Sequence, residues 1–469
     1  MTPALFHEWF VGNISFPLSQ YLYNRRKIGG EYRRSSRSES WDGDRMAAFQ
    51  VQRLRAVLEH ACRFVPFYER LFAQAGIRPR DIRDLDDMRR IPPLSRDDII
   101  ANRADLVDRR WRSSMKKADS SSRGPAEPVP FARFKRHPLV RNTSSGSTGA
   151  PAIFYEHGTV SAVSWANELR VKRWFGIRPG MREARLVRVS PEYVLRSKAN
   201  LFRRVLWNQM MLPGVNLTSK EYGLIFDRLG RFRPKTIWAF TSAVAGLARH
   251  MKENGDRLGG WKPGLVITWA APLYDHEREI IESVLECSIS NIYGLREVGH
   301  IGSTCPEGAL HVFQETHLLE TDDQGELLVT FLRPSPMPFI RYRTGDIGEL
   351  SDERCKCGRA LQIIRQFHGR TGEIYVTPDG KMFSPNFWCR TFMNARLADA
   401  VKRFQIIYAK DGTLRIKLVV EESRRPDAES ILRAAISNNF GPEMKAVFEY
   451  VEDIPPQLSG KYQMVIIEK

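Results

Sequence analysis

The sequence of 469 residues contains no apolar run that reaches the roughly 18 residues of a membrane-spanning helix. Its N-terminus shows no basic start followed by an uninterrupted apolar segment and a small-residue cleavage site, so we expect no secretory signal. Both absences predict a cytoplasmic protein without a transmembrane segment. Six cysteines are too few for a disulfide framework in a chain of this length. An internal repeat is also absent.

Large clusters of positive charge are missing too, although 72 Lys and Arg residues stand against 54 Asp and Glu residues, a net charge of +18. The excess is spread over short groups such as Arg109-Arg110-Trp111-Arg112, Lys116-Lys117 and Arg203-Arg204. A solvated basic surface explains this spacing better than a nucleic-acid interface, so we predict no nucleic-acid partner. Whether two copies form a homodimer is left open.

The length exceeds what a single core supports and predicts at least two domains. Near the N-terminus stand four aromatic residues, Phe6, Trp9, Phe10 and Phe16. We expect them to pack onto the parent domain, with docking onto a membrane or a partner as the alternative. Further on, apolar residues at helical spacing predict an amphipathic helix that starts near Asp44 and stops before Pro66; they are Val51, Leu54, Leu58 and Ala61.

From residue 151 onward the pattern is typical of an α/β fold. Short β-leaning apolar runs occupy residues 184–190, 235–239, 264–270, 288–293 and 325–331. Helical patterns at 242–251 and 275–285 separate some of them. This alternation predicts a large mixed α/β domain with mostly parallel sheets flanked by helices.

A different pattern follows residue 369. Two strand-like runs at 404–408 and 414–419 flank Asp411-Gly412, a hairpin signal, and a helix at 427–439 and a strand at 447–451 come next. We therefore predict an N-terminal domain over 1–368, helical and loop-rich in 1–140, and a small α+β domain over 369–469.

The stretch Asn142–Pro151 concentrates glycine and hydroxyl side chains: Ser145, Gly146, Ser147, Thr148 and Gly149. Glycine lets the backbone approach a ligand closely, and hydroxyl and backbone N–H groups donate to phosphate oxygens. The Lys-Ser/Thr pair of a Walker A loop is missing after Gly149. The composition thus allows either a phosphate cradle or a flexible connector.

Four later motifs follow in order, namely Tyr293-Gly294-Leu295-Arg296-Glu297, Arg341-Tyr342-Arg343-Thr344-Gly345-Asp346, Gly369-Arg370 and Ser459-Gly460-Lys461. Together with the glycine-rich stretch they resemble the adenylate-forming enzyme superfamily. Three further segments, Leu58–Ala61, Val65–Tyr68 and Cys355-x-Cys357-Gly358-Arg359, look like the phenylacetate–CoA ligase group and its CapK-like relatives of capsular polysaccharide biosynthesis. The resemblance spans about residues 41–461.

This resemblance implies an ATP site. Ser147 and Thr148 would donate to the β- and γ-phosphates, and Tyr293 with Gly294 would lie against the adenine. Glu297 would help to hold Mg²⁺, for which a carboxylate is a suitable hard ligand. Asp346 would accept hydrogen bonds from the ribose hydroxyls.

The resemblance also implies two cationic contributions. Arg370 would bind ribose or phosphate. Lys461, on a mobile C-terminal lid, would reach the α-phosphate and the carboxylate during adenylation. Two family features are missing. Many relatives have a loop lysine at the place of Ala150 or Ala152, and Gly372 replaces the usual charged residue at the lid hinge.

The segment Trp269-Ala270-Ala271-Pro272-Leu273 resembles one that lines the adenine and acyl pockets of relatives, with Ala270 and Ala271 against the nucleotide. Trp269 replaces a usual glycine and should shorten or reshape the acyl pocket, so phenylacetate is not carried over as the substrate. Further lining candidates at a strand end are Trp238, Phe240 and Thr241. For Trp238, ordinary core packing is an equal alternative.

Cys305, His311, Cys355 and Cys357 supply three thiols and an imidazole, which is a ligand set for structural Zn²⁺. The alternative is four reduced side chains without metal. A full set of four ligands would leave no open position, so the ion would brace loops without a catalytic role.

The resemblance therefore implies an ATP- and Mg²⁺-dependent carboxylic acid ligase that forms an acyl-adenylate and passes the acyl group to a thiol, with CoA favoured. Two alternatives are kept. In one the acyl group goes to an amine or hydroxyl, as in polysaccharide or metabolite biosynthesis. In the other the protein is a noncatalytic nucleotide-binding relative, as the missing loop lysine, Trp269 and Gly372 would allow.

Overall fold

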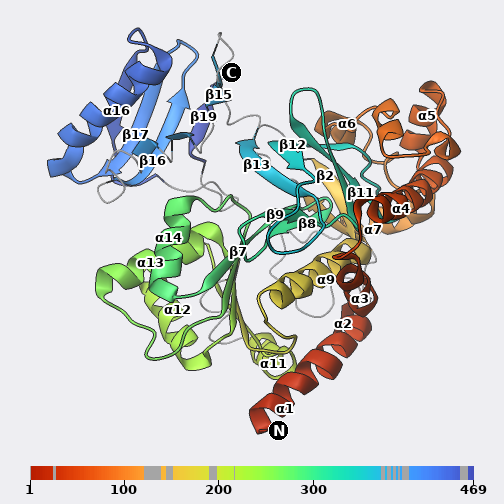
Figure 1. The fold of residues 1–469 in the computed structure, drawn as a ribbon, viewed down its shortest axis with the longest axis horizontal. Helices are drawn as coiled ribbons and strands as arrows, with labels where there is room; N and C mark the ends of the chain where they lie inside the picture. Colours follow the sequence, from red (N-terminus) through yellow and green to blue (C-terminus); the bar gives the residue numbers. More distant parts are fainter. Residues whose placement is uncertain are drawn as a thin grey trace.

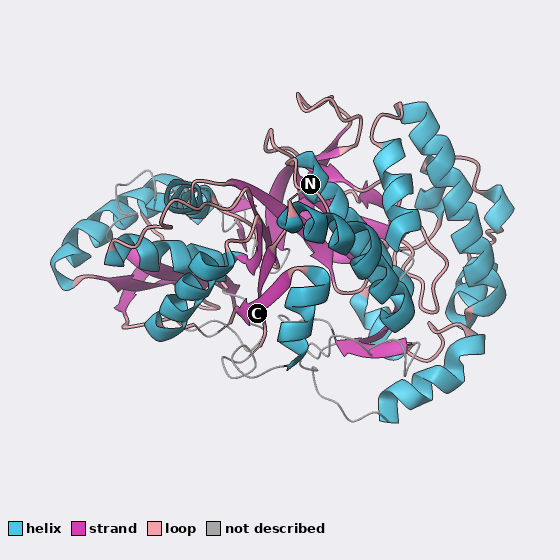
Figure 2. Ribbon diagram, turned by 90° about the horizontal axis from the view of Figure 1, so that it is seen from below, coloured by secondary structure: helices cyan, strands magenta, loops and turns pink. Residues whose placement is uncertain are grey.

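The computed structural model describes residues 2–24, 28–120, 139–143, 152–189, 198–215, 217–370, 375–377, 382–383, 387–388, 391–392, 401–454 and 463–468. A central sheet carries helices on both sides, a small sheet with its own helix lies at one end, and the N-terminal helices lie at the other (Figures 1 and 2). Within the described residues no helix is long and apolar enough to cross a membrane.

The first 120 residues are helical, with α1 (Pro3–Phe10), α2 (Phe16–Asn24), α3 (Ile28–Ser38), α4 (Gly43–Phe64), α5 (Pro66–Gln74), α6 (Arg96–Ala101) and α7 (Arg112–Ser120). The predicted amphipathic helix is α4. Its N-cap is Asp42, two residues before the predicted start, and the Asp42 carboxylate accepts a hydrogen bond from the Arg45 backbone N–H at 2.8 Å. The helix ends before Pro66, as expected, because the residue before a proline avoids the helical conformation.

Eleven strands of the described chain form one sheet in the order β10-β11-β12-β13-β9-β8-β7-β6-β5-β3-β4. Their bounds are β3 (Glu183–Val187), β4 (Gln209–Pro213), β5 (Thr236–Phe240), β6 (Leu265–Trp269), β7 (Ser288–Leu295), β8 (Gly299–Thr304), β9 (Leu310–Val312), β10 (His317–Thr321), β11 (Glu326–Phe331), β12 (Tyr342–Ser351) and β13 (Ile363–Arg370). A separate antiparallel pair, β1 (Leu139–Thr143) and β2 (Ile153–His157), flanks the glycine-rich stretch.

Strands β3 to β7 form the parallel half that the alternating pattern predicts. They carry α9 (Gly158–Trp174), α11 (Lys198–Trp207), α12 (Ser219–Phe232), α13 (Thr241–Asn254) and α14 (Asp275–Leu285). Alternate residues of these strands are buried on opposite faces: Ile237 and Val266 pack with α12, α13 and α14, whereas Trp238 and Ile267 share a cluster with α9. Burial on both faces explains why the strands appear in the sequence as continuous apolar runs.

The other half of the sheet, from β7 to β10, is antiparallel. The α/β fold class is confirmed, but parallel pairing is confined to one half of the sheet. Of the antiparallel strands beyond β7, only β11 was predicted. Strand β12 alternates buried and more exposed residues and contains Gly345 at φ 74°, so no apolar run marks it in the sequence.

The C-terminal part has a four-stranded sheet in the order β18-β17-β16-β19, with α16 (Arg425–Phe440) packed on it. Its strands are β16 (Val401–Tyr408), β17 (Leu414–Val420), β18 (Ala446–Tyr450) and β19 (Val465–Ile467), and a short pair, β14 (Tyr375–Val376) with β15 (Met382–Phe383), precedes them. The predicted hairpin is present, with Phe404 opposite Leu418 and Gly412 at φ 78° in the turn. A domain boundary at residue 369 stays a prediction.

Candidate functional site

The candidate site lies at the carboxyl ends of three adjacent parallel strands. Phe240 at the end of β5 pairs with Trp269 at the end of β6, and Trp269 pairs with Ile292 in β7. In open α/β sheets this edge is where ligands bind. The predicted residues Thr241, Ala270, Ala271, Tyr293 and Gly294 all follow or end these strands, so the structure brings them to one edge.

The turn after β6 has an unusual backbone. Ala270 adopts φ 72°, in the left-handed region that a residue with a Cβ rarely occupies. The next carbonyl, that of Ala271, accepts hydrogen bonds from Asn291 Nδ2 at 3.2 Å and from Thr241 Oγ1 at 3.3 Å. These two bonds hold the turn in its strained conformation, which is a feature often found at functional sites.

Two tyrosine–carboxylate pairs cross between the predicted motifs. The Tyr293 hydroxyl donates to Asp346 Oδ2 at 2.9 Å, and the Tyr342 hydroxyl donates to Glu297 Oε1 at 3.3 Å. In each motif the carboxylate follows its tyrosine by four residues, and each tyrosine reaches the carboxylate of the other motif. All four side chains are buried. The structure therefore joins the predicted adenine, ribose and magnesium residues into one group.

This convergence depends on curvature of the sheet. Strand β7 is separated from β12 by β8, β9 and β13 in the strand order. At about 4.8 Å between neighbours, a flat sheet would hold β7 and β12 roughly 19 Å apart. The 2.9 Å bond between Tyr293 and Asp346, and the packing of the Tyr293 ring against Phe367 of β13 at 5.2 Å, show that the antiparallel half curls back toward β7.

Asp346 is held in place by its own strand and by β11. Its backbone N–H donates to Thr344 Oγ1 at 3.0 Å, and the Thr344 hydroxyl donates to the Leu327 carbonyl at 2.8 Å. The Gly345 N–H donates to Glu326 Oε1 at 2.9 Å. The turn-like Thr344-Gly345-Asp346 segment is thus a rigid part of β12, which presents the carboxylate in one orientation.

Arg370 lies opposite Asp346 in the register of β13 and β12, so the backbone brings these two predicted residues together. The start of the glycine-rich stretch is also near, because Arg296 Nη1 donates to the Thr143 carbonyl at 3.1 Å. Ser145, Gly146, Ser147, Thr148 and Gly149 themselves lie outside the described residues, as do Gly372 and Lys461. Their predicted roles stay predictions.

An aromatic cluster occupies the predicted acyl side of this edge. Trp269 stacks on Phe240 with ring centroids 4.4 Å apart, and its centroid is 6.1 Å from that of Trp238. Trp238 is buried and also lies 5.5 Å from the His300 ring. Burial lowers the pKa of His300, so the imidazole is held neutral. Core packing of Trp238 is thus observed, and its role in lining an acyl pocket stays a prediction.

Sequence reasoning missed the contributions of Tyr342, Asn291 and His300. Tyr342 stands inside a recognised motif, and its four-residue spacing from Asp346 repeats that of Tyr293 and Glu297. This repeated spacing is the signal that could have identified it. Asn291 and His300 carry no comparable local signal, because their positions depend on how β6, β7 and β8 pair.

The four predicted metal ligands converge elsewhere. The ligand atoms of Cys305, His311, Cys355 and Cys357 all lie within 4.8 Å of one another. The Cys305 and Cys355 sulfurs are 3.7 Å apart, and Cys357 Sγ is 3.2 Å from His311 Nε2. For sulfur bound to tetrahedral zinc at ~2.3 Å, the ligand–ligand distance is about 3.8 Å. The cluster therefore fits zinc in both donor chemistry and size.

The protonation state of His311 suits this geometry. Its Nδ1 lies 3.1 Å from the Leu361 carbonyl, which only accepts, so Nδ1 carries the proton and Nε2 presents a lone pair to the thiols. Burial lowers the pKa of His311 and keeps it neutral. Burial opposes the Cys357 thiolate, but hydrogen bonds from Arg359, Cys355 and Cys305 together outweigh this effect and lower the pKa of Cys357.

The thiol cluster and the crossed tyrosine pairs lie at opposite ends of the same strands. Strand β8 begins at Gly299, two residues after Glu297, and Cys305 follows its other end. Six residues of strand span about 20 Å. An ion in the cluster would join the β8–β9 turn to the loop between β12 and β13, away from the nucleotide residues.

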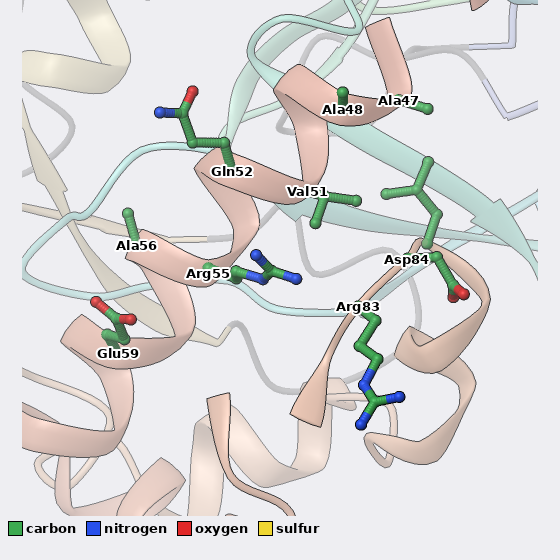
Figure 3. A pocket seen from close by; sticks show the side chains of 10 residues that line it. Ala47, Ala48, Val51, Gln52, Arg55, Ala56, Glu59, Arg83 and Asp84 are labelled. Atoms are coloured by element: carbon green, nitrogen blue, oxygen red, sulfur yellow. The ribbon is translucent and has the colours of Figure 1, made fainter. Parts of the chain in front are cut away.

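A surface pocket of about 580 Å³ lies on α4, far along the chain from these motifs (Figure 3). Its lining comes from one face of α4 and from the segment Arg83–Leu85. None of its lining residues belongs to the predicted site.

The sequence is similar to those of known ligases and of the protein CapK. Residues 375–468 match the CapK C-terminal domain. A phenylacetate–coenzyme A ligase of Thermus thermophilus is 25% identical over 397 residues, which cover 80% of this chain and 81% of the relative. The protein CapK of Staphylococcus aureus is 23% identical over 343 residues, covering 71% and 75% of the two chains.

Among solved structures, 2-hydroxyisobutyryl-CoA ligase in the postadenylation state with its acyl-AMP superposes with a TM-score of 0.68. The identity is 16%, and 92% of each chain is covered. This likeness shows that the two chains share a fold. The resemblance found in the sequence, to the phenylacetate–CoA ligase and CapK-like group, is confirmed.

Proposed function

We propose that this chain, a relative of the phenylacetate–CoA ligases and CapK among the adenylate-forming enzymes, activates a carboxylic acid with ATP and transfers the acyl group to coenzyme A. The observation that carries the proposal is the crossed pairing of Tyr293 with Asp346 and of Tyr342 with Glu297 at the carboxyl edge of the parallel strands. The names of the ligase relatives support the thiol acceptor.

In the first half-reaction a carboxylate oxygen attacks the α-phosphorus of ATP, and the bond to the bridging oxygen breaks so that pyrophosphate leaves. Asp346, fixed by β12, accepts from the ribose hydroxyls, and Tyr293 orients this carboxylate while its ring lies against the adenine. Such preorganised groups lower the barrier because they need no rearrangement during the reaction.

Glu297 would hold the magnesium ion that neutralises charge on the phosphate oxygens, as the hard oxygen donor that such an ion prefers. Tyr342 keeps this carboxylate oriented toward the nucleotide residues. The glycine-rich stretch with Ser147 and Thr148 would cradle the β- and γ-phosphates, and Arg370 would add a cation beside Asp346.

In the second half-reaction the sulfur of CoA attacks the acyl carbon, AMP leaves, and the thiol proton passes to solvent. We propose that residues 369–469 act as a lid that brings Lys461 to the α-phosphate in the first step and moves away for the second. The proposed acid is small or flat, because the stacked Trp269 and Phe240 rings narrow the acyl side. We propose a cytoplasmic site of action, where ATP and CoA are available.

We also propose that Cys305, His311, Cys355 and Cys357 bind one structural zinc ion. Their donor set and spacing support this assignment, and four protein ligands leave no position for a substrate. Its role would be to brace the loop between β12 and β13, and thereby the two strands that carry Asp346 and Arg370.

The test is acid-dependent exchange of labelled pyrophosphate into ATP across aryl, short-chain, fatty and amino acids, followed by product analysis with and without CoA. We expect exchange with at least one acid and a CoA thioester as the product. Exchange without CoA-dependent turnover would replace the thiol by an amine or hydroxyl acceptor. Nucleotide binding with no exchange for any acid would support the noncatalytic alternative.

A further inference from the structure

The N-terminal helices expose an unusual amount of apolar surface. Ten of the twelve large apolar side chains that the described residues expose belong to the helical segment Pro3–Asn24, which runs from α1 through α2, or to α11; they are Leu5, Phe6, Trp9, Phe10, Ile14, Leu18, Tyr21, Leu201, Phe202 and Val205. We call these ten residues the apolar stripe. An exposed apolar patch of this kind on a soluble protein marks an interaction site.

The spacing in α1–α2 produces a continuous face. Phe6, Phe10, Ile14 and Leu18 follow one another at intervals of four residues, the interval that aligns side chains along a helix. Helix α1, the π-helical turn Val11–Ser15 and α2 run without a break over about 33 Å. Phe6 and Trp9 are 53% and 49% exposed, so the expectation that they pack onto the parent domain is wrong.

The opposite face of this helix is already docked. Phe16 is buried between Trp165 and Trp207, with centroid distances of 5.3 and 5.6 Å, and the Trp207 indole N–H donates to the Ser19 hydroxyl at 2.6 Å. At Gly12 a Cβ would come within 2.4 Å of the Pro179 carbonyl oxygen, so the backbones touch. The stripe is therefore the outer face of a helix whose inner face is already fixed against described residues of the same chain.

Helix α11 extends the stripe beside α1. Ser15 Oγ donates to the Leu206 carbonyl at 2.7 Å, and His7 Nε2 lies 3.1 Å from the Val205 carbonyl. Figure 1 shows α1 and α11 side by side at the N-terminal end of the molecule. Leu201, at 59% exposure, and Val205 thus continue the apolar surface of α1.

A basic rim borders the stripe. A hollow of about 410 Å³ is lined by His7, Leu201 and Val205 and by three arginines. These arginines are Arg182, Arg204 and Arg231, and all three are exposed. The residues that line this hollow all belong to the described part of the chain, and none of them is acidic. Glu8 is the one acidic residue in the sequence of Pro3–Asn24.

We propose that the apolar stripe and its basic rim dock on the surface of a lipid bilayer that contains anionic headgroups. Aromatic side chains such as Trp9 and Tyr21 favour the boundary between headgroups and acyl chains, and arginine binds lipid phosphate. The protein would lie on the bilayer with α1–α2 and α11 against it. This mode needs no spanning helix.

Charge argues for a bilayer over a second copy of the chain. In a symmetric dimer the same patch meets itself, so Arg182, Arg204 and Arg231 of two chains would be drawn to one interface. Each chain also carries a net charge of +18, which opposes self-association. An anionic membrane surface attracts both the rim and the whole chain.

The test is co-sedimentation of the full chain with phosphatidylcholine vesicles, with and without phosphatidylglycerol. We expect binding to the anionic vesicles that weakens with added salt. The Phe6→Ser/Trp9→Ser variant should bind at least about tenfold more weakly, since two aromatic side chains lose their burial. The Arg204→Glu/Arg231→Glu variant should lose the preference for phosphatidylglycerol.

The matched control is Ile100→Ser/Val447→Ser, which removes two equally exposed apolar side chains, at 47% and 48%, outside the stripe. It should bind vesicles like the native chain. Circular dichroism and melting temperature of each variant check the fold. In parallel, quenching by brominated lipid should be weaker for Trp9→Phe than for the native chain.

Absence of binding to anionic vesicles would overturn the proposal. Equal loss of binding in the Ile100→Ser/Val447→Ser control would also overturn it. A third result would overturn it as well: the native chain is a dimer in sedimentation velocity, Phe6→Ser/Trp9→Ser is a monomer, and neither binds vesicles. The stripe would then be an interface between copies.

Discussion

The crossed pair of Tyr293 and Asp346 allows a quantitative test of the nucleotide site. The Tyr293 hydroxyl donates to Asp346 Oδ2 at 2.9 Å in a buried setting. A hydrogen bond to a charged group contributes about 1.5–3 kcal/mol. If Tyr293 acts on the ribose through Asp346, Tyr293→Phe keeps the ring for the adenine and removes only this orientation.

We therefore expect Tyr293→Phe to raise the dissociation constant for ATP by about tenfold, and Asp346→Asn to raise it by about 10² because a charge-assisted acceptor for the ribose is lost. The double variant should resemble Asp346→Asn alone. This corresponds to a coupling free energy of about 1.4 kcal/mol in a double-mutant cycle. Isothermal titration calorimetry with ATP measures all four constants.

Tyr450→Phe is the matched control. The Tyr450 hydroxyl donates to Glu429 Oε2 at 2.8 Å, which is a tyrosine–carboxylate pair of the same kind between β18 and α16 of the C-terminal part. Its removal should leave ATP affinity unchanged. Strictly additive effects of Tyr293→Phe and Asp346→Asn would refute the idea that the tyrosine works through the aspartate, and unchanged affinity in Asp346→Asn would remove Asp346 from the site.

Four further predictions concern other parts of the molecule. Protein purified without chelator should contain about one zinc per chain by elemental analysis. Cys357→Ser or His311→Ala should lose the zinc and melt at a lower temperature, whereas Cys287→Ser, at a free cysteine outside the cluster, should keep it. Metal-free native protein would contradict the site. Trp269→Gly should shift acid preference toward bulkier acids by about tenfold or more in pyrophosphate exchange, because it removes the ring stacked on Phe240; an unchanged acid profile would place Trp269 outside the pocket. Lys461→Ala should lower the adenylation rate by about 10² or more, the scale for one preorganised cation, and unchanged pyrophosphate release would exclude it from the mechanism. Burial lowers the pKa of His317 to about 4, so below pH ~6.5 the unfolded chain binds a proton that the folded chain does not. The free energy of unfolding, measured with urea, should therefore fall by up to about 3 kcal/mol as the pH is lowered from 6.5 to 4. An equal fall in His317→Gln would assign the effect to other groups.

Individual helices and strands, and the order of the motifs, could be predicted from the sequence. Apolar spacing identified α4, and the apolar runs located β5, β6 and β7, because strands buried on both faces leave a strong signal. Motif order carried the resemblance to the phenylacetate–CoA ligase and CapK-like group, and that resemblance selected Asp346 and Glu297 as candidate site residues. These predictions depend only on residues that are close together in the chain, and the sequence alone shows which residues those are.

Tertiary structure decided the rest. Curvature of the antiparallel half brings β12 to β7, so Tyr293 meets Asp346 and Tyr342 meets Glu297 across four positions in the strand order. It also decided that Phe16 is buried while Phe6, Trp9 and Phe10 are exposed. No periodicity encodes these outcomes, because they arise from how surfaces distant in the chain fit together.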